Sequence, residues 1–348
     1  DMQALEKQAK TLGATTKFSA RDAAEGMKYF GMAGYDTNQI MSALPSTLNL
    51  AAAGNVDLGI ACDIVSDAMT GLGMSANETT KFTDIMAATI TNSNTSVELM
   101  GETLKYVGPV AGTLGIGMGD LSVAIGLMGN AGIKGSQAGT ALRAGLTNLV
   151  KPTKEMKTAM EKYGVELVKN ADGSVNMMGT MENLRSTLGG LDQATQAQAL
   201  ATIFGKEAMS AWASVVNASE GDFNKLSDAI ANSDGKASDM ANTMQNNLKG
   251  SIDNMKSAFE GLLITIGERL IPVFRSLVDG ITGVFTWFNN LNPVIQNIII
   301  GVGGFLAVLG PLLLIVGNVI IFVTKLGMAI STLVTFFSAG GNSLFYVR

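Results

Sequence analysis

Apolar side chains recur every three or four residues along most of the first 220 residues. A polar residue precedes the first apolar position of the early runs, and a glycine follows several of the runs, which is the pattern of capped amphipathic helices. The runs predict helices over residues 19–31, 37–50, 56–71, 77–90, 96–107, 120–129, 137–149, 154–163, 178–188, 192–204 and 206–217. This part of the chain is therefore expected to be a multi-helix body.

Two short stretches interrupt the helical pattern of the body. Gly108 and Pro109, followed by small residues, predict a helix break and a loop over residues 107–112, because proline lacks a backbone donor. Residues 165–168 have strand character, residues 170–174 are turn formers, and residues 175–177 would return as a second strand. We expect one small β-hairpin there.

The composition changes after residue 220. Residues 221–250 are rich in Asn, Ser, Asp and Ala and are expected to form a polar connector. A long amphipathic helix is predicted over residues 251–289, where Pro272 should introduce a kink. Its apolar positions are Ile252, Met255, Phe259, Leu262, Leu263, Ile266, Leu270, Phe274, Leu277, Val278, Ile281, Val284, Phe285 and Phe288. Such a stripe can pack against sister copies, lie in a lipid interface, or be ordinary helical core.

The next stretch is strongly apolar. No charged residue occurs among the 45 residues from Gly280 to Thr324, and about 20 mostly apolar residues in a helix cross a bilayer core. Residues 290–337 are thus expected to form membrane-type helices or a hairpin, although a buried core helix has the same composition. Trp287 would act as an interfacial anchor beside Phe288. The candidates for membrane insertion are Trp287, Phe288, Ile298, Phe305, Leu313 and Val323.

Glycine and proline divide this apolar stretch. Asn292 and Pro293 can start a helix, and Gly310-Pro311 should interrupt it, either as a kink or as the turn of a tight hairpin. The hinge candidates are therefore Pro272 and Pro311. Glycines spaced seven residues apart fall near one face and allow a second helix to approach closely. These helix-packing candidates are Gly303, Gly310 and Gly317.

Together these patterns predict an all-α fold, with a multi-helix body that contains one small β-hairpin, followed by long amphipathic and very hydrophobic helices. The expected division is 1–220 for the body, 221–250 for the connector, 251–289 for the amphipathic helix, 290–337 for the hydrophobic helices and 338–348 for a tail. The chain begins at Asp1 without an initiator methionine, so we expect it to be a piece of a longer polypeptide. No secretory signal pattern is present near residue 1.

Composition excludes most catalytic chemistry. The chain has no histidine, which removes Ser-His-Asp and Cys-His nucleophile systems and histidine-bearing zinc sites. The single cysteine, Cys62, allows no internal disulfide and is expected to be a small core residue in a protein assembled in a reducing compartment. The glycine-rich tracts do not form a complete phosphate-binding loop. We expect no enzyme activity, no cofactor and no metal.

The net charge of −5 bears on nucleic acid binding. Proteins that grip DNA or RNA do so through clustered Lys and Arg, which displace counterions from the phosphates. We therefore expect no sequence-specific nucleic acid binding, although DNA could pass by without being held.

One succession of motifs resembles a known family. It consists of TSVEL at 95–99, GETLKYVGPV at 101–110, DLS at 120–122 and AGIKGSQAGTALR at 131–143. Over residues 5–220 this succession is similar to the core domain of phage tail tape measure proteins. The family-motif residues are Gly132, Gly135, Gly139 and Arg143. By their chemistry the glycines allow turns and close helix approach, while Arg143 either pairs with a carboxylate such as Glu102 or lies exposed on the surface.

The resemblance implies a role in the virion. Tape measure proteins fill the tail tube during assembly, set its length and leave ahead of the DNA at infection. The implied partners are sister copies, with a trimer favoured, the tail tube, distal tail and tail hub proteins, tail assembly chaperones, and the host inner membrane. The implied locations are the tail lumen and tail tip, the host cytoplasm during assembly, and the host inner membrane after ejection.

Two other functions compete with this one. A pore-forming toxin, or a bacteriocin-like membrane protein, would also carry a hydrophobic hairpin guarded by amphipathic helices. Killing of host cells by the isolated chain would favour that reading. An enzyme that opens the cell wall would require a domain outside these residues.

Overall fold

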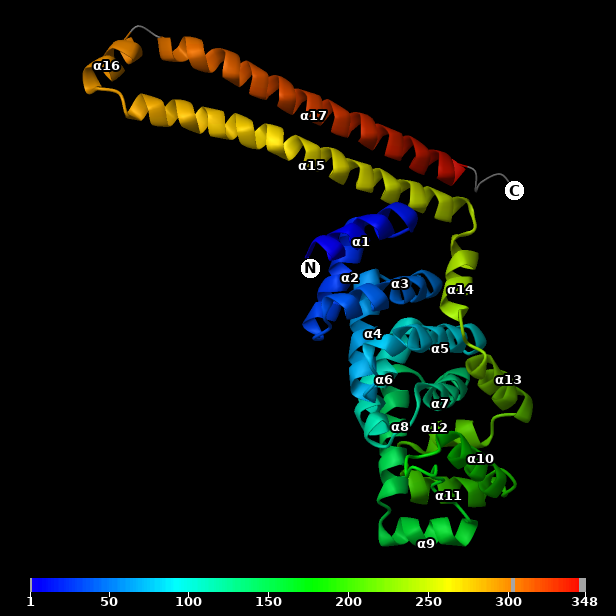
Figure 1. Ribbon diagram of the computed structural model, residues 1–348. Coiled ribbons are helices and arrows are strands. Elements are labelled where there is room, and N and C mark those ends of the chain that lie inside the picture. The colour runs from blue at the N-terminus through cyan, green and yellow to red at the C-terminus, as the bar shows by residue number, and fades with distance from the viewer. Residues whose placement is uncertain (1, 302–303, 344–348) are drawn as a thin grey trace. The chain divides into compact units, whose positions relative to one another are not determined.

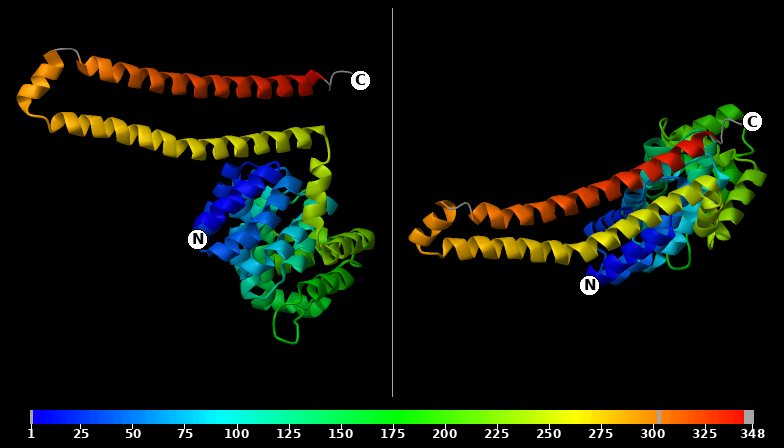
Figure 2. Two further views of the ribbon diagram at one scale, coloured as in Figure 1. Left: turned by 45° about the horizontal axis from the view of Figure 1, so that its top comes forward. Right: turned by 90° about the horizontal axis from the view of Figure 1, so that it is seen from above.

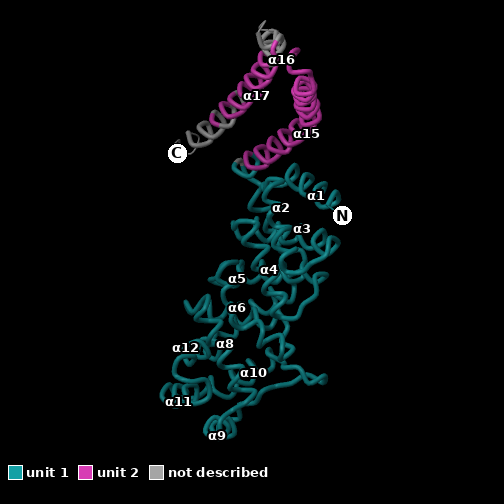
Figure 3. Tube along the Cα trace, turned by 90° about the vertical axis from the view of Figure 1, so that its left-hand side faces the viewer, with its two compact units in different colours: residues 1–251 teal, residues 252–348 magenta. Residues whose placement is uncertain are grey.

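The computed structural model describes residues 2–301 and 304–343. The chain divides into two compact units, Asp1–Ser251 and Ile252–Arg348 (Figure 3). The first unit is called the body.

The body is built from fourteen α-helices and one 3-10 helix over its described residues (Figure 1). They are α1 Met2–Thr15, α2 Ala20–Met32, α3 Thr37–Gly54, α4 Leu58–Leu72, η1 Ala76–Glu78, α5 Thr79–Asn92, α6 Val97–Thr113, α7 Met118–Asn130, α8 Gly135–Val150, α9 Lys154–Tyr163, α10 Met177–Leu188, α11 Gln193–Phe204, α12 Met209–Val216, α13 Glu220–Ala231 and α14 Lys236–Gln245. The expected all-α fold of the body is confirmed.

Helix starts in the body follow from local side-chain chemistry. At α2 the Ser19 hydroxyl accepts from the Asp22 N–H, and the Asp22 carboxylate accepts from the Ser19 N–H in return. Asp36 and Gln39 form the same reciprocal pair at α3. These bonds satisfy backbone donors that have no partner within the helix.

The core of the body lies along the packed series of α2, α4, α6 and α8, with α3 and α5 beside it (Figures 1 and 2). α3 carries no charged residue and packs against helices on several sides, so Leu44, Leu48 and Leu50 are all buried. A helix that is apolar on most of its circumference must be enclosed by others. This explains why α3 is a central element of a folded body.

The predicted helix break at residues 107–112 is wrong. α6 continues through Pro109 to Thr113. A proline removes a single backbone donor, and packing can offset that loss. Here Gly71 of α4 lies against Pro109, and a Cβ at Gly112 would lie 2.6 Å from the Gly71 carbonyl oxygen. The absence of side chains lets the backbones of α4 and α6 meet, and this contact holds the helix together across the proline.

The predicted β-hairpin is also not formed. Among the described residues there is no strand, and the segment between α9 and α10 contains only one isolated antiparallel bridge, between Lys169 and Val175. Two backbone bonds join its sides, from the N–H of Asn170 to the Ser174 carbonyl and from the N–H of Asn176 to the Val168 carbonyl. The pairing extends no further, because the N–H of Val168 donates to the Thr180 hydroxyl and the N–H of Val175 donates to the Leu114 carbonyl. Packing against α10 and the end of α6 therefore replaces the hairpin by an irregular loop.

The polar segment 221–250 contains two helices that pack on the body. α13 contacts α5 and α7, and α14 contacts α3 and α5. No local side chain caps α14, and the buried carboxylate of Asp84 in α5 takes that role by accepting from the N–H groups of Gly235 and Ala237, each at 2.9 Å. The polar composition predicted a connector, but this long-range cap orders the segment.

Over its described residues the second unit contains α16, α17 and nearly all of α15. α15 spans Leu248–Asn289, α16 spans Pro293–Gly301 and α17 spans Gly304–Ser343. Pro272 lies inside α15, which continues past it, and α17 passes through positions 310 and 311 without a turn. The chain changes direction around α16 (Figure 1). The sequence left two alternatives for Gly310-Pro311, a kink and a hairpin turn. The structure contains no hairpin turn at that position.

Candidate functional site: the motif helices and the apolar C-terminal unit

The glycines of the family motif shape the turn between α7 and α8. Gly132 has a φ of +83° and Gly135 a φ of +58°, values that side chains with a Cβ rarely adopt. Gly135 begins α8, and its carbonyl accepts from the Thr103 hydroxyl of α6 at 3.0 Å. The turn thus directs α8 back onto α6.

Gly139 allows the close approach of these two helices. A Cβ built on Gly139 would lie 2.5 Å from the carbonyl oxygen of Thr103 and 2.8 Å from the Cβ of Tyr106. No real Cβ makes a contact that short with a backbone atom, so α6 and α8 can pack as they do only around a glycine. The motif residues therefore serve the packing of the body.

Of the two alternatives for Arg143, the structure shows an exposed side chain and not an ion pair with Glu102. Its guanidinium lies over the ring of Tyr106, with 5.8 Å from Cζ to the ring centroid, and it forms no ion pair with Glu102 in the described structure. A cation over an exposed aromatic ring contributes about 0.5–1 kcal/mol. This contact adds to the seam between α6 and α8 from the outside.

Trp212 is a central residue that the sequence reasoning missed. It is fully buried, stacks on Phe204 at a centroid distance of 4.4 Å, and donates from Nε1 to the Ala141 carbonyl at 3.0 Å. Its ring occupies the space where Gly145 has no side chain. The signal available in the sequence was a tryptophan on a short apolar helix together with a glycine inside another helix.

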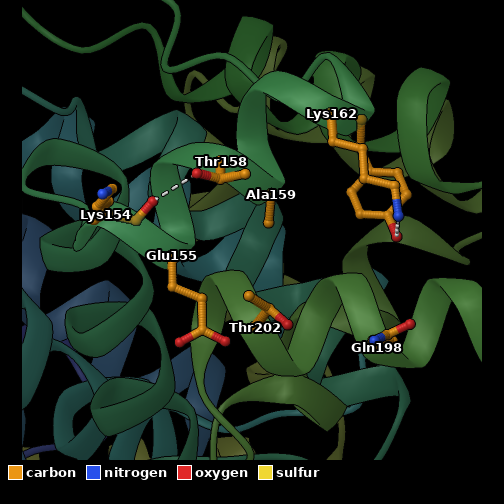
Figure 4. Close-up of a pocket in the computed structure, with 8 residues that line it drawn as sticks. Lys154, Glu155, Thr158, Ala159, Lys162, Gln198 and Thr202 are labelled. Carbon is orange, nitrogen blue, oxygen red and sulfur yellow. Dashed lines mark hydrogen bonds between the residues drawn. The ribbon is translucent and has the colours of Figure 1, made fainter.

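One surface hollow of the body is lined by both charged and uncharged side chains. One cavity of about 530 Å³ lies between α9 and α11 and is lined by Lys154, Glu155, Thr158, Ala159, Lys162, Tyr163, Gln198 and Thr202 (Figure 4). In it the Lys162 ammonium donates to the Tyr163 hydroxyl at 3.0 Å, while the Glu155 side chain points away from Lys162 (Figure 4). Within the described residues no group of three or more Cys, Asp and Glu side chains could hold a metal ion.

Cys62 is the core residue that its neighbours predicted. It is fully buried in α4, and a Cβ at Gly26 would lie 2.8 Å from its sulfur. Burial raises the pKa of the Cys62 thiol, and the nearby carboxylates of Asp57 and Asp63 raise it further. The thiol is therefore held in its protonated, unreactive form.

Among its described residues, the second unit contains one helix that is long and apolar enough to cross a membrane. The window is Leu313–Thr332 of α17, 20 residues of which none is buried. By length and composition α3 and α4, with a bend of 117° between them, would also pass as one broken span, but those helices lie in the core of the body. The window in α17 is thus one part of the described chain whose apolar side chains lack cover.

The insertion candidates fall along this unit as follows. Leu313 is 67% exposed and Val323 43% exposed on α17, while Trp287 is 58% exposed and Phe288 half-buried near the end of α15. At Gly317 an added Cβ would meet no described atom within 4 Å, so the structure shows no second helix against it. Gly303 lies outside the described residues, as do the side chains of Ile298, Phe305 and Pro311 and the surroundings of Gly310.

Sequence comparison relates the chain to known phage tail proteins. The family described as phage-related minor tail proteins matches residues 6–205. The tape measure protein of Pneumococcus phage Dp-1 is 35% identical over 290 residues, which are 83% of this chain and 25% of that protein. The probable tape measure protein of Escherichia phage P2 is 30% identical over 285 residues, 81% of this chain and 35% of that protein. No solved structure matches the chain.

These matches define a structural protein of a phage tail. The chain belongs to the family of phage-related minor tail proteins, and the resemblance to tape measure proteins seen in its sequence is confirmed. The chain spans about a quarter to a third of the length of these two relatives.

Proposed function

We propose that this chain is part of a tape measure protein that sets tail length during assembly, leaves the virion at infection, and inserts α17 into the host inner membrane to help deliver the genome. The observation that supports the membrane step is the uncovered apolar window Leu313–Thr332 in a protein of the phage tail. A window of that length matches the hydrocarbon thickness of a bilayer.

The apolar unit requires cover until lipid becomes available. Contiguous apolar surface of this size aggregates in water, so it must be shielded during assembly and storage. We propose that sister copies, most simply three, and the tail tube, distal tail and tail hub proteins supply this cover in the virion. Tail assembly chaperones would do so in the host cytoplasm beforehand.

A charge in the middle of the window tests the membrane step. Ile320 is 56% exposed, lies near the middle of Leu313–Thr332 and is five residues from Lys325, a spacing that does not form an ion pair on a helix. Ile320→Asp therefore places an unpaired carboxylate near the bilayer centre, which disfavours insertion by about 2.5–3.5 kcal/mol. Ser331→Asp adds the same charge near the end of the window, where the headgroups can solvate it. Phage carrying Ile320→Asp should adsorb and assemble normally but deliver DNA at least tenfold less efficiently than phage carrying Ser331→Asp.

The assay is the fraction of adsorbed particles whose DNA enters the cell, measured with labelled genomes, together with potassium efflux from the host. Equal DNA delivery by the two variants would remove the membrane step from the proposal. Killing of host cells by the purified chain, without any tail, would favour a pore-forming toxin instead.

Tail length tests the assembly role separately. Duplication of residues 252–284 adds 33 residues to α15, about 50 Å of helix at roughly 1.5 Å per residue. If α15 lies along the tail axis, electron micrographs should show tails longer by up to this amount. Tails of unchanged length, with the duplicated protein present in them, would contradict a length-setting role for this helix.

A further inference from the structure

α14 is a helix that the body holds in place and that its own sequence supports poorly. It spans ten residues, Lys236–Gln245, and isolated helices shorter than about 12–15 residues are marginal in water. Its Ser, Asp, Asn and Thr residues are weak helix formers, and no local side chain caps its first turn. α14 is therefore helical only while it is docked on α3 and α5 (Figure 1).

The apolar anchor of α14 is small. Only Ala237 and Ala241 of this helix are buried. Met240 is half-buried, and its sulfur lies 3.1 Å from the Thr91 hydroxyl of α5. The free energy of burial scales with the apolar area removed from water, and an alanine removes little. Hydrophobic burial alone therefore holds α14 weakly.

The preceding helix, α13, is held more firmly. It buries Phe223, Leu226 and Ile230 against the body. Ser219 caps its first turn, and the Arg185 guanidinium of α10 lies over the Phe223 ring, with 4.5 Å from Cζ to the ring centroid. We therefore expect α13 to stay in place under conditions that release α14.

The carboxylate of Asp84 makes the docking of α14 all-or-none. It is buried in α5, and its two oxygens accept from the N–H groups of Gly235 and Ala237 at 2.9 Å each. A buried carboxylate without donors is strongly disfavoured, so α14 cannot lift partly while still covering Asp84. The segment is either docked with both bonds made, or released with the carboxylate in water.

We propose that α14 is a latch between the body and the apolar C-terminal unit, docked in the assembled particle and released during infection while the rest of the body stays folded. The inference rests on the proposed function in one respect, that the apolar unit travels from the virion to the host membrane. An order-to-disorder transition of one segment is a known kind of switch, and it leaves the packed core unchanged.

Release of the latch lengthens the link between α13 and α15. Residues 232–247 form this link, and α14 makes up ten of them. As a helix these ten residues span about 15 Å, and as an extended chain they span about 34 Å. Unfolding of α14 thus gives the apolar unit roughly 20 Å of additional reach without unfolding the core of the body.

Hydrogen exchange on the full chain in mild detergent tests whether α14 opens separately from α13. We expect the amides of α14 to exchange at least tenfold faster than those of α13. Low concentrations of urea should leave this difference unchanged, because a local opening exposes little surface. Equal protection of α14 and α13 would overturn the latch, since the two helices would then open together.

A cross-link between α14 and α5 should hold the latch closed. In a Cys62→Ala background, Thr91→Cys and Met240→Cys introduce two thiols at side chains that approach to 3.1 Å. They are joined with 1,2-ethanediyl bismethanethiosulfonate, a short reagent that reducing agents remove. The matched control, Met240→Cys with Met244→Cys, joins two positions one turn apart within α14 and leaves its docking free.

In the full chain, the cross-link between positions 91 and 240 should slow exchange in α14 at least tenfold relative to the control. Equal exchange in the two would overturn undocking as the route by which α14 opens.

The same cross-links in virions test release during infection. Joined peptides are identified by mass spectrometry, and DNA delivery is measured per adsorbed particle. Virions joined between positions 91 and 240 should deliver DNA at least tenfold less efficiently than virions joined between 240 and 244, and a reducing agent should restore delivery. Equal delivery would overturn the role of the latch in infection.

A variant that needs no reagent weakens the latch instead. Asp84→Asn removes one of the two acceptors that hold α14, whereas Asp67→Asn changes an exposed carboxylate of α4. Heated virions that carry Asp84→Asn should release their DNA at a lower temperature than virions that carry Asp67→Asn. Release at the same temperature would contradict the latch.

Failure of the latch and failure of the proposed function give different results. Virions that carry Ile320→Asp are measured in parallel with the cross-linked virions. Reduced delivery by Ile320→Asp virions, with unchanged delivery by the cross-linked ones, contradicts the latch alone. Unchanged delivery by both contradicts the membrane step as well.

Discussion

Gly139→Ala should destabilise the body although alanine is the better helix former. Replacing glycine by alanine inside a helix ordinarily gains about 0.5–1 kcal/mol. At Gly139 the added methyl group would lie 2.5 Å from the Thr103 carbonyl oxygen and 2.8 Å from the Tyr106 Cβ, so α6 and α8 must separate. Overpacking of this kind costs about 1–3 kcal/mol, and weakening of the hydrogen bond from the Thr103 hydroxyl to the Gly135 carbonyl adds about 1 kcal/mol.

The net expectation is a loss of about 1–3 kcal/mol in the free energy of unfolding of the body. For a unit of this size such a loss lowers Tm by roughly 2–4 °C per kcal/mol. The measurement is thermal unfolding of the full chain in mild detergent, followed by circular dichroism.

Gly31→Ala is the matched control for this change. Gly31 is also inside a helix, but the nearest side-chain atom to its added methyl group would be 4.0 Å away. This variant should be as stable as the parent or more stable by up to about 1 kcal/mol. If Gly139→Ala were as stable as Gly31→Ala, the explanation of the family motif as a close-packing device would be refuted.

Three further changes test other contacts in the body. Asp84→Asn leaves one of the two N–H groups at the start of α14 without an acceptor, so hydrogen exchange in α14 should rise roughly 30-fold, equivalent to about 2 kcal/mol, while exchange in α6 and α8 stays unchanged. Trp212→Phe keeps the stacking on Phe204 but loses the bond to the Ala141 carbonyl, and urea unfolding should show a loss of about 1–2 kcal/mol; no loss would contradict the role assigned to that bond. Burial raises the pKa of the Cys62 thiol above its unfolded value, so its contribution to stability is complete below pH of about 8.5 and is lost as the pH rises; Cys62→Ala should show a smaller alkaline loss of stability than the parent, and equal losses would contradict this.

The sequence correctly predicts those features of the fold whose physical cause lies within a few residues along the chain. The starts of α2, α3 and α9 follow from capping residues within three positions of the first turn, and α9 spans the predicted residues. The burial of Cys62 follows from its apolar neighbours on one helix face. The motif glycines, named from family resemblance alone, are explained by the seam between α6 and α8.

The incorrect predictions share a different cause. Pro109 was read as a helix break, and residues 165–177 as a hairpin, from residue types that favour those structures in isolation. In the body, Gly71 lies against Pro109, and Thr180 and Leu114 take the hydrogen bonds that a ladder would have used. These partners lie 12 or more residues away along the chain, so the residues next to Pro109 and Val168 do not predict them.

Periodicity, caps and composition, which act over a few residues, were sufficient to determine the helical class, most helix positions, and the presence of a long uncharged stretch. Only the tertiary structure decided which helices meet, because those contacts join positions distant in the sequence. The Trp212 ring reaches a carbonyl 71 residues away, and Asp84 caps a helix that starts about 150 residues later. The free energy of such contacts depends on burial and geometry that exist only after the chain has folded.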